Sequence, residues 1–591
     1  MAISAVMKRK RKAKRAPKPR GGSGSVAESA GKKLTSYNVG ALPILNHVIK
    51  RAKLEEFLRE FMVEDKRCKI SPVIGTLVLL RNYLVSREPI YGVGEWARQY
   101  VPSLLGLSSR QVASLNDDGA GRNLNRLFDA DCPSLVLAIT RHVVEEFGLD
   151  LSEIHNDSTT ITFSGSHEEA RNEKNVRGKK TPAITWGHNK DHRPDLKQLL
   201  YNLVVSSDGA VPIAFGVDSG NVTDDTTHRA TWDFLCQIVG GPEFIYVADS
   251  KLATHANMTH IANRSGRFIS VLPRTRNEDK IFRAKLVRRE VKWTEIDRKY
   301  DEDDKAKLVD TLSVSSEPAL TNEGFRLLWL HSSRKVELDR AARAAKTSRA
   351  IGELSGLRLR MHSPRTRYRE REQVEKAVKK LLAETHATKY MLVEIRPEVR
   401  TIDVQTTPGR PGPNTQYRKE KQQRFDIVFT TNDEAIEEAE RQDGVFPLVT
   451  NDRKLSAREV LQTYKRQSQI EKRFSQLKTQ FRVAPVFLKS TERIVALLTV
   501  YYLALLVQSL LERELRIAMI SDGLDSIPLY PEERDCKSPA TRRLIDFFAN
   551  IQRHELKSPG ERSSVAFSTE LSDLQRQILG LLQVPMSDYR A

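Results

Sequence analysis

The stretch IHNDSTTITF, residues 154–163, predicts a β-strand because it is rich in β-branched residues and alternates apolar with polar side chains. Further along, LLYNLVVSSDGAVPIAFGVDSG, residues 199–220, predicts two more strands. Asp208 and Gly209 lie between these two strands, and such a pair is typical of a tight hairpin turn. The middle of the chain therefore begins with three strands, of which the last two form a hairpin.

The segments that follow alternate between helix and strand. Residues 224–240 (DDTTHRATWDFLCQIVG) have helical spacing, and residues 244–250 (FIYVADS) form a short apolar run of the kind found in buried central strands. Another helix is predicted over residues 254–266 and another strand over residues 267–273. Three strands, a helix, a strand, a helix and a strand are the order of a ribonuclease-H-like core, an α/β fold with a mixed sheet flanked by helices. We assign residues 151–274 to the first part of this core.

The residues before this core divide into two predicted regions. Residues 1–34 predict a disordered basic arm, since residues 8–20 hold nine Lys or Arg and no acid. Residues 35–150 predict a helical region, because apolar residues recur there at helical spacing. Helices with basic faces can read DNA or serve only as a scaffold, and both interpretations of residues 35–150 remain open.

The residues after the first part of the core divide into three predicted regions. Residues 275–445 predict an inserted β-rich domain with charged helices, since strand-like pieces surround a long charged stretch. Residues 446–515 predict the second part of the core, with a helix over residues 455–478 that Ser456 caps. Residues 516–591 predict a helical C-terminal region.

Three carboxylates lie where the predicted core would bring acids together. Asp157 is in the first strand and Asp249 ends the short apolar strand, and these two strands would be neighbours at the centre of the sheet. Glu471 lies on the helix over residues 455–478, and Lys478, two turns further on, would share its face. Any one of these acids is a weak signal in a chain with 76 of them, so the prediction depends on their common fold.

The chemistry of these three residues favours one class of metal. Carboxylates without His or Cys neighbours are hard oxygen ligands, which suit Mg²⁺ or Mn²⁺ better than zinc. Two such ions can activate a water or a 3′-hydroxyl and stabilise the leaving oxygen of an in-line phosphoryl displacement. We therefore predict Asp157, Asp249 and Glu471 as metal-binding and catalytic residues in a phosphoryl displacement.

The composition fits a nucleic-acid partner. The formal net charge is +20, and only nine of the basic residues lie in residues 8–20, so the rest of the chain is basic as well. Four scattered cysteines without a CxxC pair argue against a zinc site and a disulfide framework and favour a reducing compartment. Residues 494–511 are nearly apolar for about one membrane span, but the polar Thr499, Gln508 and Ser509 within them favour a buried core helix.

The sequence resembles the DDE transposases of bacterial insertion sequences, in the branch with a β-rich insertion between the second Asp and the Glu. The resemblance extends from about residue 40 to residue 515, and its most specific parts are GHNKDHRPDLKQ (187–198) and YKRQSQIEKRFSQLK (464–478). Further matching stretches are IHNDSTTITFSG (154–165), YVADSKLAT (246–254), DGVFPLVTN (443–451) and PVFLKSTERIVALLTVYYLALL (485–506). The resemblance implies a ribonuclease-H-like catalytic core that works with Mg²⁺ or Mn²⁺.

The family's signature on the late helix is Tyr, Arg, Glu and Lys at fixed spacing. Tyr464, Glu471 and Lys478 match it, but the Arg position holds Gln467, with Arg466 one place earlier. The resemblance implies that Tyr464, Lys478 and Arg466 hold DNA phosphates near the cut. Two interpretations of Gln467 remain open: the function has shifted to Arg466, or this is a weakened copy of the enzyme.

Other residues are candidates for contact with DNA. A basic cluster before the second strand is expected either to contact the substrate strand or to be a solvated loop; it consists of Lys190, His192, Arg193 and Lys197. Trp293 and Trp329, in the insertion, are candidates for stacking on a displaced base, although core packing is the favoured interpretation. Asn221 and Asp224 are expected to form a turn.

We therefore expect a DNA transposase that binds the terminal inverted repeats of its element, nicks the strand with metal-activated water, and joins the 3′-hydroxyl to target DNA. The resemblance implies a homodimer or a larger synaptic complex, in the bacterial cytoplasm at the nucleoid and without a membrane. Two alternative hypotheses remain: a catalytically decayed DNA-binding regulator, and a metal-dependent nuclease that cuts without joining.

Overall fold

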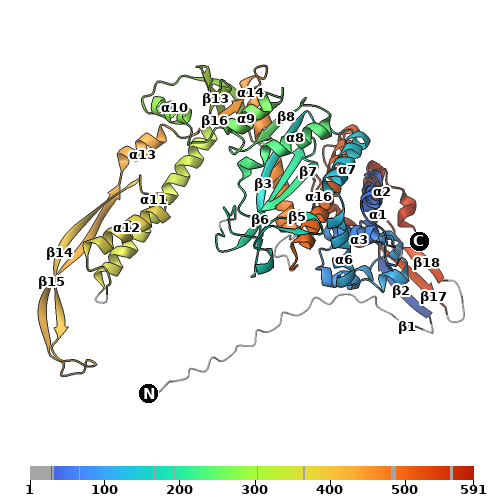
Figure 1. The fold of residues 1–591 in the computed structure, drawn as a ribbon, viewed down its shortest axis with the longest axis horizontal. Helices are drawn as coiled ribbons and strands as arrows, with labels where there is room; N and C mark the ends of the chain where they lie inside the picture. The colour runs from blue at the N-terminus through green and yellow to red at the C-terminus, as the bar shows by residue number, and fades with distance from the viewer. Residues whose placement is uncertain are drawn as a thin grey trace. The chain divides into compact units, whose positions relative to one another are not determined.

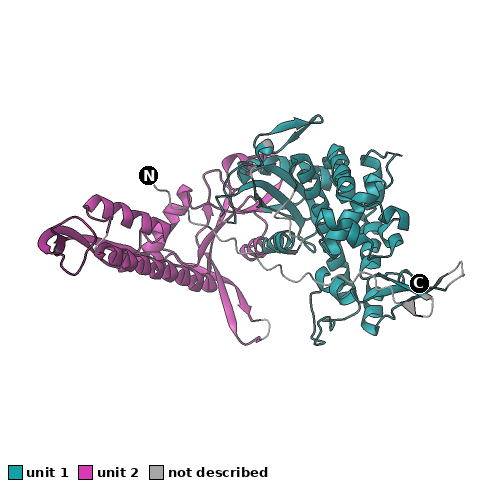
Figure 2. Cartoon of the chain, turned by 90° about the horizontal axis from the view of Figure 1, so that it is seen from below, with its two compact units in different colours: residues 1–247, 466–591 teal, residues 248–465 magenta. Residues whose placement is uncertain are grey.

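The structure is a computed structural model that describes residues 28–29, 32–65, 67–165, 167–191, 193–301, 304–363, 366–480, 488–558 and 564–590. The chain forms two compact units, which are coloured separately in Figure 2. The first unit consists of residues 1–247 together with residues 466–591, and the second consists of residues 248–465. The first unit is therefore built from both ends of the chain, and the second from one continuous segment. The domain boundaries expected from the sequence stay predictions.

The strands and helices predicted for residues 151–274 are present in the predicted order. They are β3 (Glu153–Phe163), β6 (Lys197–Ser206), β7 (Pro212–Ser219), α8 (His228–Val239), β8 (Ile245–Ala248), α9 (His255–Ala262) and β9 (Arg267–Val271). The predicted turn between β6 and β7 is confirmed, since Gly209 has a φ of 73°, in the left-handed region that glycine tolerates. A short hairpin that was not predicted, β4 (Lys174–Val176) with β5 (Lys179–Thr181), lies between β3 and β6.

Within the described residues, ten strands form one large sheet. Their order is β10-β11-β13-β16-β9-β8-β3-β6-β7, with β12 paired to β13. β3 pairs antiparallel with β6 and β6 with β7, which places Asp157 opposite Leu203. The result is a mixed α/β architecture with a large sheet, consistent with the predicted ribonuclease-H-like core.

The strands in the first part of the predicted inserted domain pair with the large sheet, whereas a separate domain was expected. β10 (Trp293–Tyr300), β11 (Leu308–Ser315), β12 (Ala319–Leu320) and β13 (Arg326–Ser332) belong to the large sheet and do not form a separate sheet. β13 pairs with β16 (Val445–Thr450), which pairs with β9. Four consecutive residues of β13, Leu327 to Leu330, are buried, as expected for a strand covered on both faces.

The remainder of the second unit is helical apart from one long hairpin. α10 (Asn277–Val287) precedes β10, while α11 (Ser333–His362), α12 (Arg371–Glu384) and α13 (Asp433–Glu440) lie between β13 and β16. β14 (Met391–Gln405) and β15 (Tyr417–Thr431) form the hairpin, which packs on α11 and α12 at its base and continues beyond them (Figure 1). The charged helices expected in the insertion are therefore present.

The N-terminal part of the first unit is helical, as predicted. Its helices are α1 (Leu42–Arg51), α2 (Leu54–Phe61), α3 (Pro72–Val85), α4 (Val93–Ala97), α5 (Ser109–Val112), α6 (Asp117–Asp129) and α7 (Cys132–Phe147). Of these, α1, α3 and α6 pack on α16 (Thr491–Ser521), which also contacts β7, where Tyr502 stacks on Phe215 with ring centroids 4.6 Å apart. By length and composition α16 is long and apolar enough to cross a membrane, but 94% of its most apolar window is buried inside the protein. This matches the predicted core helix, which is longer than expected.

The C-terminal region is not wholly helical, contrary to the prediction for residues 516–591. It contains α17 (Thr541–Phe548) and α18 (Asp573–Leu581), but also β17 (Gln552–Lys557) and β18 (Ser564–Ser568). β17 pairs with β2 (Lys32–Asn38), in a four-stranded sheet ordered β1-β2-β17-β18, with β1 at Glu28–Ser29. The last residues of the predicted basic arm thus lie in a strand, whereas residues 1–27 lie outside the described residues.

Candidate active site

Asp157 lies near the middle of β3. Its neighbours Asn156 and Ser158 are buried, whereas its own side chain is 22% exposed. One carboxylate oxygen accepts the backbone N–H of Ser158 at 2.7 Å. A negatively charged group thus reaches solvent from a strand that is otherwise almost completely buried.

Lys190, predicted to contact DNA, lies beside Asp157. Its Nζ is 3.5 Å from an oxygen of Asp157 and 2.9 Å from an oxygen of Asp224. The same ammonium donates hydrogen bonds to the hydroxyl of Ser158 at 2.6 Å and to its carbonyl at 2.7 Å. Asp224, which was expected only to form a turn, is therefore linked to the surroundings of Asp157 through a shared ammonium.

Asp249 directly follows β8, as predicted, and belongs to the second unit. All four residues of β8 are buried. One carboxylate oxygen of Asp249 accepts the N–H of Lys251 at 3.0 Å, and its carbonyl accepts the hydroxyl of Ser270 at 2.6 Å. The backbone at the end of this strand is therefore held in place by hydrogen bonds.

The long helix predicted over residues 455–478 is interrupted. α14 (Ala457–Lys465) and α15 (Ser468–Ser475) are separated by a turn at Arg466 and Gln467. The predicted capping box at the start is confirmed, since the N–H of Ser456 donates to Glu459 at 2.7 Å and the N–H of Glu459 donates to the Ser456 hydroxyl at 3.2 Å. The prediction of one continuous helix was wrong at the turn, where both side chains bond to β3.

Glu471 and Lys478 lie on different kinds of helix. Glu471 is exposed in the first turn of α15, whereas Lys478 lies in a π-helix, η5 (Gln476–Gln480). Because a π-helix has more residues per turn, the α-helical spacing that placed the two side chains on one face does not hold between them. Lys478 donates to both oxygens of Asp191, at 2.7 and 2.9 Å.

Four polar residues bond the start of α15 to β3, and we call them the β3 clamp: Glu153, His155, Arg466 and Gln467. Arg466 donates to both oxygens of Glu153, through Nε at 2.6 Å and through Nη2. His155 bonds to Glu153 through Nε2 and to the side-chain oxygen of Gln467 through Nδ1, both at 2.8 Å. The amide of Gln467 donates to the carbonyl of Asn156 at 2.8 Å. The clamp therefore ends on the residue next to Asp157.

The electrostatics of the clamp follow from these contacts. Burial alone would raise the pKa of Glu153, but the hydrogen bonds from Arg466 and His155 hold it below its usual value. The same ion pair raises the pKa of Arg466, although burial opposes this. Because Glu153, His155 and Asp157 alternate along β3, the clamp and Asp157 lie on the same face of the strand.

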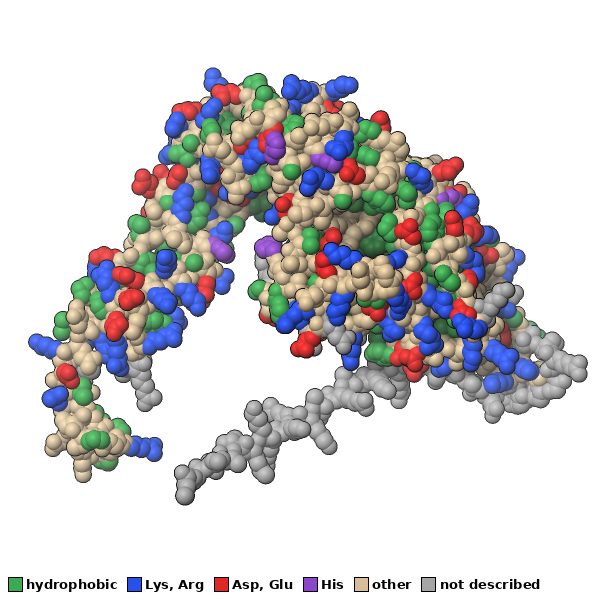
Figure 3. All heavy atoms as spheres, viewed as in Figure 1, with side chains coloured by type: hydrophobic (Ala, Val, Ile, Leu, Met, Phe, Trp, Pro, Cys, Tyr) green, Lys and Arg blue, Asp and Glu red, His purple; other side chains and the backbone are tan. Residues whose placement is uncertain are grey.

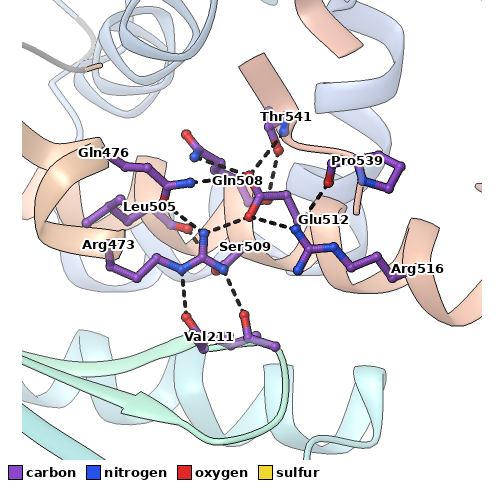
Figure 4. A network of polar contacts seen from close by, with 12 residues as sticks. Val211, Arg473, Gln476, Leu505, Gln508, Ser509, Glu512, Arg516, Pro539 and Thr541 are labelled. Carbon is purple, nitrogen blue, oxygen red and sulfur yellow. Dashed lines mark hydrogen bonds and ion pairs between the residues drawn. The ribbon is translucent and has the colours of Figure 1, made fainter. Parts of the chain in front are cut away.

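The end of α15 is held by a different set, the buried anchor, which consists of Arg473, Glu512, Gln508 and Thr541 (Figure 4). Arg473 donates to Glu512 at 2.7 Å and to the carbonyls of Gly209 and Ala210 at 2.7 and 2.9 Å. Glu512 also accepts the N–H of Thr541 at 3.1 Å. The side chains of Arg473 and Glu512 are 4% and 3% exposed, and burial lowers the pKa of Arg473. The anchor thus joins α15 to α16, to the β6–β7 turn and to α17.

Two groups near Asp224 show how burial acts in this region. Burial raises the pKa of Asp218, and the negative charge of Asp224 adds to the effect. Burial lowers the pKa of His228 to about 4, although the charges of Asp224 and Asp225 oppose it. His228 bonds to Tyr246, which accepts from Asn156 on the face of β3 opposite to the clamp.

The remaining residues predicted to contact DNA are found in varied surroundings. Tyr464 lies in α14, in the second unit, and His192 lies outside the described residues. Arg193 pairs with Asp195 at 2.7 Å on the surface, while Lys197 is buried, with its ammonium 5.0 Å from the ring of Trp186. Their roles in DNA binding stay predictions.

The two tryptophans of the insertion pack within the protein. Trp329 is buried and its ring lies parallel to that of Phe282, with centroids 4.0 Å apart. Trp293 meets the edge of Phe282 and the ring of His331. Core packing, the favoured interpretation, is therefore confirmed for Trp329, and stacking on a displaced base is excluded for this buried ring.

Sequence reasoning missed Glu153, His155 and Asp224 as parts of the site. Glu153 and Arg466 are separated by 313 residues, so no local pattern links them. The only available signal was the alternation of Glu153, His155 and Asp157 along one predicted strand, which places three ionisable side chains on one face.

The predicted metal ligands can be tested against these surroundings. Asp157 and Glu471 offer only oxygen donors, which is what Mg²⁺ and Mn²⁺ prefer. The ammonium of Lys190 lies 3.5 Å from Asp157, so this position already accommodates a positive charge. The residues therefore fit a hard cation. Among the described residues, no three His, Cys, Asp or Glu side chains are gathered closely enough to hold a metal, and Asp249 belongs to a different unit from Asp157 and Glu471.

Comparison with known proteins gives two family matches. Residues 150–507, more than half of the chain, match the family described as "Transposase DDE domain". Residues 34–141 match the family described as "Domain of unknown function (DUF4277)". No curated protein matches the sequence.

One solved structure similar to the chain is described as a piggyBac transposase synaptic complex with hairpin DNA. The identity is 11%, the match covers 50% of this chain and 59% of that chain, and the TM-score is 0.23. Such a low score carries no argument about the fold. The family match is stronger evidence, because it extends from three residues before β3 into α16 and includes Asp157, Asp249 and Glu471. The chain belongs to the transposase DDE domain family, a family of enzymes that act on DNA.

Proposed function

We propose that this chain is an active DNA transposase of the bacterial insertion-sequence type, in which the segment between Asp249 and Glu471 contains the family's inserted domain. It binds the terminal inverted repeats of its element, cleaves a strand and joins the freed 3′-hydroxyl to target DNA. The observation that carries the proposal is the β3 clamp, which bonds the start of α15, the helix of Glu471, to the residue next to Asp157.

In this proposal Asp157, Asp249 and Glu471 hold two Mg²⁺ or Mn²⁺ ions. When bound, such ions lower the pKa of the attacking water and stabilise the leaving oxygen. The contribution of the protein is to position its groups: the β3 clamp fixes the start of α15 relative to Asp157, and the buried anchor fixes its end. Lys478 and Tyr464 hold DNA phosphates, for which Lys478 exchanges its partner Asp191.

The contacts of Gln467 favour the interpretation that this chain is an active enzyme over the interpretation that it is a decayed copy. It occupies the Arg position of the family signature but makes two hydrogen bonds within the protein, to His155 and to the carbonyl of Asn156. An Arg side chain has no acceptor oxygen and would bring a second guanidinium next to Arg466. The departure from the signature is thus matched by a defined structural role.

The proposal extends to partners and location. The helices of residues 35–150 contribute to DNA binding, and the enzyme acts as a homodimer or larger synaptic complex in the bacterial cytoplasm. The net charge of +20 supports a DNA partner, and Lys and Arg side chains are spread over the face shown in Figure 3. The burial of α16 by surrounding helices supports a protein that works without a membrane.

The test is strand cleavage and transfer on labelled DNA that carries the end of the element, in Mg²⁺ or Mn²⁺. Asp157→Ala, Asp249→Ala and Glu471→Ala are each expected to bind this DNA but to cleave it roughly a thousandfold more slowly or not at all, as loss of an essential catalytic group does. Glu375→Ala, an exposed acid on α12, is the matched control and is expected to cleave normally.

Each other outcome has a definite meaning. Binding without cleavage by the unsubstituted protein would support the regulator hypothesis, and cleavage without a joined product would support a nuclease. A variant that still cuts would show that its residue was assigned wrongly.

A further inference from the structure

The ammonium of Lys190 is surrounded by oxygen atoms. Four of them lie within 3.5 Å: one carboxylate oxygen each from Asp157 and Asp224, and the hydroxyl and carbonyl oxygens of Ser158. An ammonium has only three N–H groups, so four acceptor oxygens outnumber the hydrogen bonds that it can donate one to each. Such a set of oxygens is also the kind of environment that a hard cation prefers.

The position of Lys190 is defined by its backbone as well as by its side chain. Its backbone N–H donates to the hydroxyl of Thr160 at 3.3 Å, so the start of the side chain is fixed beside β3. The side chain itself is 30% exposed, and those of Asp157 and Asp224 are 22% and 13% exposed. The ammonium therefore has access to solvent, and a flexible four-carbon stem allows it to move without moving the backbone.

The two carboxylates hold Lys190 unequally. The ammonium is 2.9 Å from Asp224 but 3.5 Å from Asp157. Asp224 is the closer and the less exposed partner, so it is the one that retains the ammonium. Asp157 has the longer contact, so separating the ammonium from Asp157 costs less free energy than separating it from Asp224.

We infer that Lys190 is a built-in counter-ion of the catalytic site, which neutralises Asp157 until this carboxylate takes up a divalent cation. Lys190 then moves away from Asp157, keeps contact with Asp224 or solvent, and becomes available to a phosphate of the DNA. Asp224 acts as the positioning residue that keeps the ammonium close to the site. This inference rests on the proposed metal-dependent function and adds to it a competition between one side chain and the metal.

The first experiment measures metal binding without DNA or catalysis. Mn²⁺ is titrated into the full-length protein, and free Mn²⁺ is followed by electron paramagnetic resonance. Lys190→Met, which keeps the length of the side chain and removes its charge, is expected to bind the first Mn²⁺ at least about fivefold more tightly, which is the effect of one like unit charge near 4 Å in bulk water. Lys180→Met is the matched control, because Lys180 also pairs with a carboxylate, that of Glu173, and is expected to change nothing.

The outcomes separate this inference from the function on which it rests. If the unsubstituted protein binds no Mn²⁺, the proposed metal-dependent function fails. If it binds Mn²⁺ and Lys190→Met binds it with equal or lower affinity, the function stands and the counter-ion inference is wrong. Circular dichroism of the Lys190→Met protein confirms that it is folded before either conclusion is drawn.

The second experiment detects the movement of Lys190 in the unsubstituted protein. Brief acetylation with an amine-reactive ester, followed by mass spectrometry, measures the reactivity of each lysine with and without Mg²⁺. Lys190 is expected to react several times faster when Mg²⁺ is present, while Lys180 serves as the internal control in the same digest. Equal reactivity of Lys190 in both conditions would overturn the proposed release.

Discussion

The two ends of α15 are attached to the rest of the first unit in contrasting ways. The β3 clamp at its start is partly open to solvent, since the side chain of Arg466 is 40% exposed while that of Glu153 is 9% exposed. The buried anchor at its end is almost fully shielded from solvent, since the side chains of Arg473 and Glu512 are 4% and 3% exposed. Between the two attachments lies Glu471, exposed and in the first turn of the helix.

The difference in exposure between the two attachments implies different costs of opening them. A buried ion pair is costly to break, because the charge that remains is shielded from water and has lost its counter-ion. A partly exposed pair is replaced by water when it opens, so its loss costs much less. We therefore interpret the anchor as the fixed end of α15 and the clamp as the end at which the position of Glu471 is adjusted.

The largest effect is expected from breaking the anchor on one side. Glu512→Ala leaves Arg473 buried without its counter-ion and is expected to lower the free energy of unfolding by about 3–5 kcal/mol. Urea denaturation measures this loss. The matched control is the double variant Arg473→Met with Glu512→Leu, which removes both charges and is expected to lose much less. If the single variant loses under about 1 kcal/mol, the anchor is not the fixed end that we describe.

A smaller effect is expected from Gln467→Ala, in the clamp. This variant removes two hydrogen bonds and is expected to lower the free energy of unfolding by about 1–2 kcal/mol. Because the clamp ends next to Asp157, the rate of single-turnover DNA cleavage is expected to fall while the affinity for DNA stays unchanged. Gln467→Glu, which keeps one acceptor oxygen, is expected to recover part of the rate. A loss of affinity with an unchanged rate would instead assign Gln467 to DNA binding.

A still smaller effect is expected from Arg466→Lys. The variant keeps the charge but loses the paired hydrogen bonds to Glu153, and a partly exposed ion pair contributes about 1 kcal/mol or less. The salt dependence of DNA binding is expected to stay the same, since Arg466 is bonded to Glu153. A weaker salt dependence in Arg466→Gln, which removes the charge that Arg466→Lys keeps, would show that Arg466 contacts a DNA phosphate, as the first of the two interpretations of Gln467 holds.

The smallest effect concerns pH. The pKa of Glu153 is held below its usual value, so the clamp adds stability above about pH 4.5, the usual range for Glu. This contribution is lost as the pH falls through the lowered pKa, because the unfolded chain takes up the proton first. Unfolding measured from pH 6 to pH 3 is expected to depend less steeply on pH in Glu153→Gln than in the unsubstituted protein. An equal pH dependence of unfolding in the two proteins would show that the carboxylate of Glu153 does not stabilise the fold.

The sequence predicted the core well because its signals are local. The apolar run of β8 and the turn at Gly209 each depend on a few adjacent residues, and both are found where they were expected. The capping box of Ser456 and Glu459 is a short-range pattern of the same kind. Predictions of this type need no knowledge of distant contacts.

The parts that were missed depend on long-range contacts. The turn at Arg466 and Gln467 interrupts residues that favour a helix, because both side chains bond to β3. β17 has a polar sequence, QRHELK, and becomes a strand because β2 pairs with it. Lys190 was assigned to DNA by its charge, whereas its position depends on Asp157 and Asp224, each more than 30 residues away.

The central position of α16 has a consequence for how the protein is made. α1, α3 and α6 pack on this helix, yet the ribosome makes the whole second unit before it reaches residue 491. At about 5–20 residues per second, the apolar faces of the early helices stay uncovered for many seconds of translation. A gene copy with a premature stop before residue 491 would therefore yield a nascent chain that aggregates or recruits chaperones. Such a truncated copy could not persist as a soluble competitor of the intact enzyme.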